Sequence, residues 1–208
     1  MTFRLDLRST EPTFKRPVIL QHPQIPGPLS GMNPRTILGR KWWDRERRRA
    51  YKKNHYNCHA CGESPDFDPY QDKLHAHECY AIDWRHGKAV YIETVALCYS
   101  CHAFIHAGRL RALVDEGETD PKELTHILSR GVELLQSVNR YPFWRTYVIY
   151  LEYVKGVMPG NAVGQARDLG IVDKYSVLHL PDHMWTIKVF NNTYRRDENG
   201  DIQVVKDS

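Results

Sequence analysis

Two Cys-x-x-Cys pairs constrain this chain more than any other feature of its sequence. Cys58 and Cys61 form the first pair, and Cys98 and Cys101 form the second after thirty-six intervening residues. Each pair can place two thiolates on one side of a tight turn, and two such turns supply the four soft ligands that tetrahedral zinc prefers. The pattern therefore predicts a structural zinc site that ties two distant segments of the chain together.

A disulfide framework is the alternative interpretation of these cysteines. The chain has five cysteines, an odd number, and its opening residues mix charges into every apolar run, unlike a secretory leader. Both features favour a reducing compartment, where disulfides are rare. A redox Cys-x-x-Cys would leave the second pair unexplained. We therefore take zinc as the interpretation and expect the fifth cysteine, Cys79, to be a small buried side chain.

Composition indicates a folded chain of moderate size. Of its 208 residues, 41% are hydrophobic and 26% are charged, which is enough apolar material for one compact domain with extensions. The net charge of +4 is only mildly basic and does not by itself indicate a nucleic-acid partner. The most apolar stretch, residues 141–156, is interrupted by Arg145, Glu152 and Lys155, so we expect no membrane span.

The N-terminal quarter of the chain divides into an arm and a basic helix. Residues 1–34 hold six of the twelve prolines, which break helices, so this arm should run extended over the surface. Residues 35–56 contain nine Lys or Arg against two acids and have mostly helical spacing. A solvated helix side is the alternative, but the adjacent cysteine pair favours phosphate contacts. The candidate DNA-binding residues are Arg45, Arg48, Arg49 and Lys52.

A short antiparallel ribbon is predicted after the first cysteine pair. Residues 73–82 alternate in polarity and place His75 and His77 on one side of a strand. Residues 87–97 form a second strand-like run after a turn. We expect His75 to be a surface residue.

A helix should follow the ribbon. Residues 98–114 begin with the second cysteine pair and continue with helical spacing, which puts His102 and His106 at positions i and i+4. Two imidazoles so placed can converge on one ion. His59, which lies between the first two cysteines, is expected to point outwards.

The C-terminal region, residues 111–208, should pack on this part as an α+β elaboration. Residues 120–138 carry the signals of a helix start followed by apolar residues at helical spacing, and residues 142–156 indicate another helix. Asn199-Gly200 lies in an alternating stretch and predicts a β-hairpin.

The ribbon and helix, with a histidine on the first strand, Leu-Cys-x-x-Cys-His opening the helix and a Cys-x-x-Cys upstream, resemble the zinc-containing HNH endonucleases of the ββα-metal class. Residues 38–107 carry this resemblance, and many phage and bacterial members have a similar His-Glu pair and a basic, Trp-containing helix. The resemblance implies an α+β fold. A ββα-metal module with a structural zinc would occupy residues 35–110, after the basic helix and extended arm and before a helical region and a C-terminal β-hairpin.

The resemblance also implies roles for individual residues. His77 matches the signature histidine that polarises a water to attack phosphorus, so it is the candidate general base. His102 and His106 match histidines that hold a catalytic divalent ion, either Mg²⁺, Mn²⁺ or another transition metal. The four ligands of the structural Zn²⁺ would be Cys58, Cys61, Cys98 and Cys101.

Two positions depart from the family pattern. Many members have a His-His or Asp-His pair where this chain has His77-Glu78, so Glu78 could be an acidic ligand or could replace the base. The middle asparagine of the signature has no clear counterpart, and Glu93 and Thr94 are the nearest residues. In the family that residue braces a loop or binds metal, and Glu93 is the candidate for this role.

These features lead us to expect a metal-dependent endonuclease that hydrolyses DNA phosphodiester bonds by nicking or double-strand cleavage. The alternative is a catalytically eroded, zinc-stabilised nucleic-acid-binding or adaptor protein on the same scaffold. A zinc-ribbon module for protein contacts would leave the histidines idle. We expect DNA as partner, a homodimer or a phage or bacterial protein as a further partner, and a cytoplasmic location, which is the bacterial host cytoplasm if the chain is phage-encoded.

Overall fold

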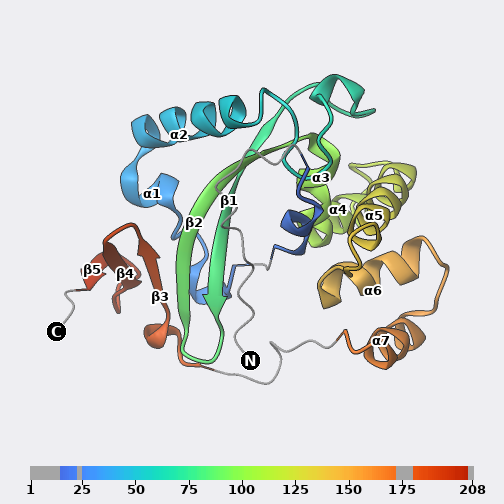
Figure 1. Cartoon of the computed structure of the whole chain (residues 1–208). Helices are drawn as coiled ribbons and strands as arrows, with labels where there is room; N and C mark the ends of the chain where they lie inside the picture. Colours follow the sequence, from blue (N-terminus) through green and yellow to red (C-terminus); the bar gives the residue numbers. More distant parts are fainter. Residues whose placement is uncertain (1–14, 23–24, 172–179, 206–208) are drawn as a thin grey trace.

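The structure, a computed structural model, describes residues 15–22, 25–171 and 180–205. Within these ranges the chain forms seven α-helices and one five-stranded sheet, a mixed α+β fold as expected (Figure 1). Residues 1–14 of the predicted arm lie outside the described ranges. The helices are α1 (Pro34–Leu38), α2 (Arg40–Lys53), α3 (Tyr99–Ile105), α4 (Ala107–Asp115), α5 (Pro121–Gln136), α6 (Trp144–Tyr153) and α7 (Pro159–Asp168); the strands are β1 (His75–Asp83), β2 (Lys88–Leu97), β3 (Thr186–Val189), β4 (Asn192–Arg196) and β5 (Ile202–Val205).

The predicted ribbon is the long antiparallel pair β1–β2. His77 lies opposite Val95, and Cys79 lies opposite Glu93. The register then shifts so that Tyr80 lies opposite Tyr91, which leaves Ile92 as the extra residue of a β-bulge. Because side chains alternate along a strand, this extra residue changes the face to which the first half of β2 points.

The C-terminal strands extend the same sheet rather than forming a separate hairpin. β3 pairs with β2 in parallel, and the sheet order is β1-β2-β3-β4-β5. The predicted hairpin around Asn199-Gly200 is confirmed as the β4–β5 turn, where Gly200 has a φ of 87°. Asp197 stabilises this turn because its carboxylate accepts hydrogen bonds from the backbone N–H groups of Asn199 and Asp201.

Two hydrophobic cores lie on opposite faces of the β1–β2 ribbon. The larger core includes Cys79, Val95 and Leu97 together with the buried faces of helices α3 to α6 and residues of α7. The smaller core includes Tyr80 and Tyr91 and is completed by residues of the C-terminal strands. Figure 1 shows α3 to α7 on one side of the ribbon and α1, α2 and β3 to β5 on the other. The ribbon is therefore the central layer of the molecule.

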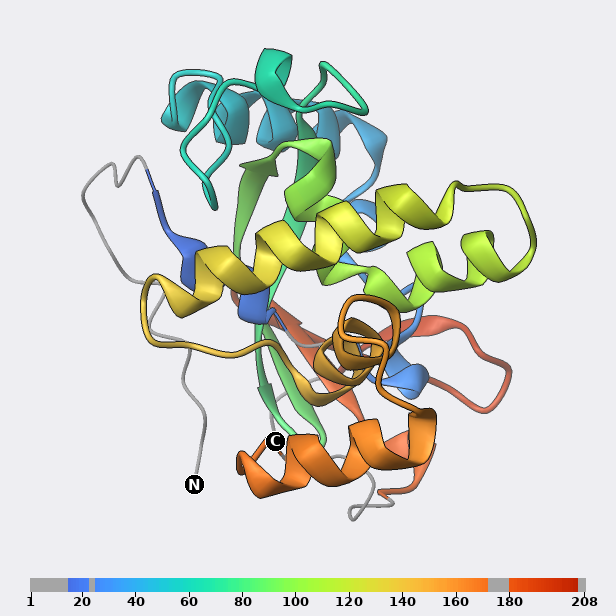
Figure 2. The same ribbon diagram turned by 90° about the vertical axis from the view of Figure 1, so that its right-hand side faces the viewer.

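Helix α5 packs very closely against α3. Both predicted C-terminal helices are confirmed, and α5 begins as expected, with the Asp120 carboxylate accepting the Lys122 backbone N–H at 2.8 Å. Gly131 of α5 faces the Phe104 ring of α3, and a methyl group at this position would overlap with that ring. Figure 2 shows α5 crossing in front of the ribbon with α3 beside it.

The described part of the arm differs from the extended surface segment that its prolines predict. Residues Pro17–Gln21 form a short 3-10 helix, η1, whose Ile19 and Leu20 are buried in the larger core. Further along, Leu29 and Met32 are buried in the smaller core. The prolines do break regular helices, but the apolar residues between them supply enough burial to pack the segment inside.

No helix within the described ranges is long and apolar enough to cross a membrane.

Candidate metal centres

The two cysteine pairs meet at the start of α3. The turn that carries Cys58 and Cys61 is closed by backbone hydrogen bonds from Gly62 N to Cys58 O and from Cys58 N to Glu63 O, both 2.8 Å. Gly62 has a φ of 81°, a conformation that glycine adopts without strain. Cys98 is the N-cap of α3, and Cys101 lies in its first turn.

The four thiols form one compact group that could hold a metal such as zinc. Their sulfur atoms lie within 4.8 Å of one another, and Cys61 Sγ is 3.9 Å from Cys98 Sγ. All four side chains are buried and none is in a disulfide. Hydrogen bonds from Cys101 and the other two thiols lower the pKa of Cys61, whereas the pKa values of Cys98 and Cys101 are raised. Four sulfur donors in a closed shell are the set that structural zinc prefers.

His59 corrects one expectation from the sequence. It is 2% exposed rather than pointing outwards. Its Nδ1 lies 3.1 Å from Ala96 N and accepts that backbone hydrogen bond from β2. Burial lowers the pKa of His59 to about 4, so the ring is neutral at pH 7. The residue between the first two cysteines therefore anchors the turn to the sheet.

A second group contains three histidines from different elements. His77 comes from β1, His102 from α3, and His106 is the residue at which α3 ends and α4 begins. One ring nitrogen from each lies within 4.8 Å of the others. His77 is buried, His102 is half-buried and His106 is exposed, so the group is open on one side.

His22 adds a fourth imidazole that sequence reasoning missed. It follows η1, is 5% exposed, and places Nδ1 at 3.3 Å from His77 Nε2. The backbone N–H of Tyr80 donates to His22 Nε2 at 2.8 Å. These two contacts fix the orientation of both rings. Nothing near His22 in the sequence signals this role, because its partners lie more than fifty residues away.

The imidazoles of this group are neutral at physiological pH. Burial, together with the neighbouring His106, lowers the pKa of both His22 and His102 to about 3. Burial and the three neighbouring histidines hold the pKa of His77 well below its usual range. Neutral imidazoles offer lone pairs, and nitrogen donors suit Zn²⁺, Mn²⁺, Co²⁺ or Ni²⁺ better than Mg²⁺. The three-histidine group fits a divalent transition metal.

His75 lies at the rim of this group and is half-buried rather than a fully exposed surface residue. Its ring stacks on His102 with a centroid distance of 5.1 Å, and its Nε2 lies 3.1 Å from the Gln71 side-chain oxygen.

The two candidate carboxylates lie elsewhere. Glu78 points to the face of β1 opposite to His77, because neighbouring residues of a strand alternate, and burial raises its pKa. Glu93 shares the face of His77, but its carboxylate accepts from Arg16 at 2.8 Å and from Lys53 at 3.0 Å. Burial opposes ionisation of Glu93, yet these two cations lower its pKa overall. The structure does not bring Glu78 or Glu93 together with the histidines.

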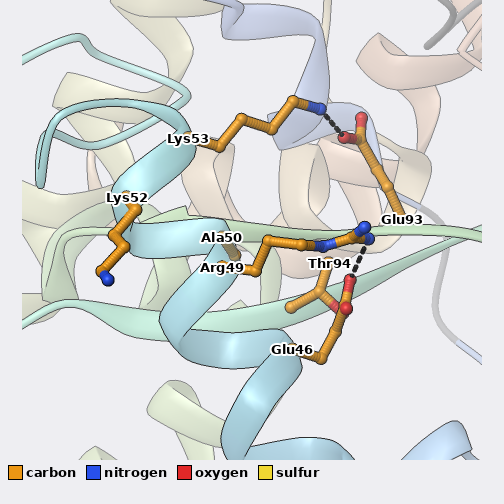
Figure 3. Close-up of a pocket in the computed structure, with 7 residues that line it drawn as sticks. All are labelled: Glu46, Arg49, Ala50, Lys52, Lys53, Glu93 and Thr94. Carbon is orange, nitrogen blue, oxygen red and sulfur yellow. Dashed lines mark hydrogen bonds and ion pairs between the residues drawn. The ribbon is translucent and has the colours of Figure 1, made fainter.

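The predicted basic residues are exposed on α2, which packs against β2 through the buried side chains of Glu46 and Ala50. Arg49 pairs with Glu46 at 2.7 Å, and Arg48 donates to the Asp44 carbonyl. Beside them, a pocket of about 450 Å³ lies between α2 and β2. Figure 3 shows Arg49 and Lys53 reaching towards the carboxylates of this pocket, while Lys52 points away from them. The pocket residues are Glu46, Arg49, Ala50, Lys52, Lys53, Glu93 and Thr94.

Comparisons of the chain with protein-family models, with curated proteins and with solved structures found no match.

Proposed function

We propose that the chain is a metal-dependent endonuclease of the HNH type that hydrolyses DNA phosphodiester bonds. The observation that carries the proposal is the open three-histidine group beside a closed four-cysteine group, with Cys101 and His102 adjacent on α3. Two antiparallel strands followed by this helix support the assignment, because the ββα-metal class uses the same order of elements. The resemblance and this geometry point to the same four cysteines and three histidines, but not to the same carboxylates.

We assign His77, His102 and His106 to the binding of one divalent ion. Such an ion supplies Lewis-acid polarisation of the phosphate and a bound water of lowered pKa. His77 is the candidate base by resemblance, but one of its ring nitrogens lies within 4.8 Å of one ring nitrogen of His102 and one of His106, which favours a shared ligand role. His22 holds the His77 ring in place from the buried side, and the exposed edge at His106 leaves room for a phosphate. We assign a structural role to Glu93, because its carboxylate forms ion pairs with Arg16, just before η1, and with Lys53 at the end of α2.

The basic face of α2 would contact the DNA backbone. Arg45, Arg48 and Lys52 are exposed, and they carry charge that phosphate can neutralise. Such contacts position the duplex without reading its sequence. Zn²⁺ bound by the four cysteines would hold the turn after α2 against α3, which fixes the basic helix relative to the three-histidine group.

A second candidate is a zinc-stabilised DNA-binding or adaptor protein that does not cut. The placement of Glu78 and Glu93 away from the histidines favours it, because no carboxylate of the sequence-predicted site then stands beside the ion. The two candidates share the fold, the zinc and the basic helix, and they differ in hydrolysis.

Incubation of zinc-loaded protein with supercoiled plasmid distinguishes the two candidates. Wild-type protein should nick the plasmid when Mn²⁺, Co²⁺, Ni²⁺ or Mg²⁺ is added and should not nick it in EDTA. His102→Ala and His106→Ala should each lower the rate by at least about 100-fold, because each removes a ligand of the ion. His86→Ala, which removes an exposed histidine of the β1–β2 turn, is the matched control and should cut normally.

Binding without cutting under every metal would reject the nuclease and favour the second candidate. Binding itself is measured by fluorescence anisotropy of a labelled duplex at several salt concentrations. Replacing both Arg45 and Lys52 by Ala should weaken binding and reduce the dependence on log salt concentration by about 2, because each side chain neutralises roughly one phosphate. Lys88→Ala, an exposed lysine of β2, is the control. Equal binding by the wild type and both variants would show that Arg45 and Lys52 of α2 do not contact the DNA.

A further inference from the structure

We propose that Arg109 of α4 binds a phosphate group at the open side of the three-histidine group. The inference rests on the proposed function and deepens it, because it names a residue for the substrate phosphate that belongs neither to the predicted site nor to the HNH resemblance. A phosphate group can come from the DNA backbone or from a free phosphate ion, and both sources offer the same oxygens to an arginine.

The start of α4 places Arg109 beside His106. His106 is the N-cap of this helix, so Arg109 occupies the third helical position. Its backbone N–H donates to the His106 carbonyl at 2.8 Å and closes the first turn. A side chain at this position lies on the same face as the N-cap residue, because Cα–Cβ bonds tilt towards the start of a helix. The guanidinium therefore extends from the turn that holds His106.

Both residues of this turn are open to solvent. His106 and Arg109 are exposed, whereas His77 is buried and His102 is half-buried. A phosphate that approaches the three-histidine group from solvent therefore arrives on the side of His106. The charge of Arg109 is felt there, since burial first, and then repulsion from this guanidinium, lower the pKa of His106.

Arg111, two residues further along α4, shows how the chain engages an arginine that serves the fold. Its Nη1 contacts the Glu152 carboxylate at 3.0 Å, its Nε lies 3.5 Å from Asp115, and its guanidinium lies over the Tyr153 ring. Arg109 has no ion pair and no side-chain hydrogen bond within the part of the chain that the structure describes. Its charge and its N–H donors are therefore available to a ligand.

A phosphate suits these donors. The planar guanidinium can donate two parallel hydrogen bonds to two oxygens of one phosphate. Three neutral imidazoles add no negative charge that would repel this anion. A cation beside the histidines also meets negative charge where it develops during phosphodiester hydrolysis.

Two simpler accounts predict different behaviour for Arg109→Gln. If Arg109 is only a solvated surface residue, the substitution should change neither metal nor phosphate binding. If Arg109 only repels cations, the substitution should tighten Co²⁺ binding and leave phosphate binding unchanged. If Arg109 binds phosphate, the substitution should weaken phosphate binding and change the Co²⁺ affinity by less than about threefold.

The test measures binding of inorganic phosphate by calorimetry to full-length protein that carries both zinc and Co²⁺. We expect Arg109→Gln to bind phosphate at least about tenfold more weakly, the scale of a charge-assisted hydrogen bond, and Gln retains a helix propensity close to that of Arg. Arg109→Lys should lie between this variant and the wild type, because it keeps the charge without the paired donors. Arg167→Gln, which removes an exposed arginine of α7, is the matched control and should bind normally.

Single-turnover nicking of plasmid by the same proteins distinguishes the two sources of phosphate. If the ligand is the DNA backbone, Arg109→Gln should slow nicking at least about 100-fold, as expected for an arginine that meets the charge of the transition state. Weaker phosphate binding with normal nicking would support the site with a free phosphate ion as its ligand.

Equal phosphate affinity of Arg109→Gln and the wild type would overturn the inference, and so would tighter Co²⁺ binding with unchanged phosphate binding. A wild-type protein that binds no Co²⁺ or no phosphate would overturn it as well. Binding of both ions by the wild type, with phosphate binding weakened in Arg109→Gln but no nicking by any protein, would reject the nuclease and support the phosphate site. The two proposals can therefore fail separately.

Discussion

The four-cysteine and three-histidine groups share helix α3 but differ in how the chain encloses them. All four cysteines are buried, and together they offer four sulfur donors within 4.8 Å of one another. In the histidine group, burial falls from His77 through His102 to the exposed His106, so one side stays open. Closed four-ligand shells are typical of structural zinc, whereas three protein ligands with an open side are typical of ions that meet a substrate. One short helix and the residues at its two ends therefore contribute to two sites suited to different tasks.

The largest expected difference in stability is between substitutions of two adjacent residues of α3, Cys101 and His102. Cys101→Ser removes a buried ligand, and the protein should lose zinc and its cooperative thermal transition, since structural zinc contributes on the order of 10 kcal/mol to folding. His102→Ala should keep both the zinc and the transition, with a loss of less than about 2 kcal/mol. Circular dichroism melts and zinc stoichiometry check both. A folded, zinc-loaded Cys101→Ser protein would show that the cluster is not a structural centre.

The next largest change in stability is expected at the contact between α5 and α3. Gly131→Ala should lower the free energy of unfolding by about 1–3 kcal/mol, because the added methyl group overlaps with the Phe104 ring. Gly164→Ala in α7 is the matched control, since no atom lies within 4 Å of its added methyl group. That change should stabilise the protein by up to about 1 kcal/mol through helix propensity. Urea unfolding measures both, and equal effects at the two glycines would contradict the close contact.

Mild acid should lower the free energy of unfolding, because the buried histidines bind protons more weakly in the folded protein than in the unfolded chain. The pKa values of His22 and His59 are lowered, mainly by burial, to about 3 and about 4, whereas the unfolded chain has a histidine pKa of about 6.5. Between these values the unfolded state binds more protons, so stability falls as pH drops below about 6.5. Each fully buried ring contributes about 1.4 kcal/mol per pH unit in this window. Urea midpoints at pH 7.5, 6.5 and 5.5 measure the slope, with zinc assayed in each sample. A constant free energy of unfolding from pH 6.5 to 5.5 at full zinc content would contradict this prediction.

The smallest effect is expected at the rim of the histidine group. His75→Ala should change stability by less than about 0.5 kcal/mol, because the ring is half-buried and contacts only the rings of His102 and Tyr99 and the Gln71 side chain among the interactions of the described residues. Its effect on Co²⁺ affinity, measured by calorimetry on zinc-loaded protein, should be a few-fold at most. A reduction as large as that of His102→Ala would make His75 a ligand and extend the group to the surface.

Local patterns in the sequence predict the parts of the molecule that depend on local spacing. The Cys-x-x-Cys pairs, the His102–His106 interval and the Asn199-Gly200 turn each lie within a few residues, and each occurs where expected. His22 could not be predicted, because its contacts to His77 and Tyr80 arise only when η1 packs beside β1.

The remaining differences have the same origin. A short turn between two ligands usually faces solvent, which places His59 outside, yet its backbone hydrogen bond to Ala96 draws it into the sheet. The sequence made Glu93 a candidate site residue, but Arg16 and Lys53 engage its carboxylate from two other segments. Spacing along the chain carries no information about such contacts between distant segments.

The burial of η1 has a consequence for the order in which the protein can be made. This segment is the first described part of the chain, yet Ile19 and Leu20 pack in the core built by α3 and α5, and Gln21 donates to the Tyr141 carbonyl at 2.5 Å. During synthesis these residues leave the ribosome long before their partners exist. Ile19 and Leu20 therefore cannot be buried in this core until the residues up to Tyr141 have emerged. Translation pausing or chaperone binding while residues 22–141 are being made should thus affect the yield of folded protein more than the same events after α6 is complete.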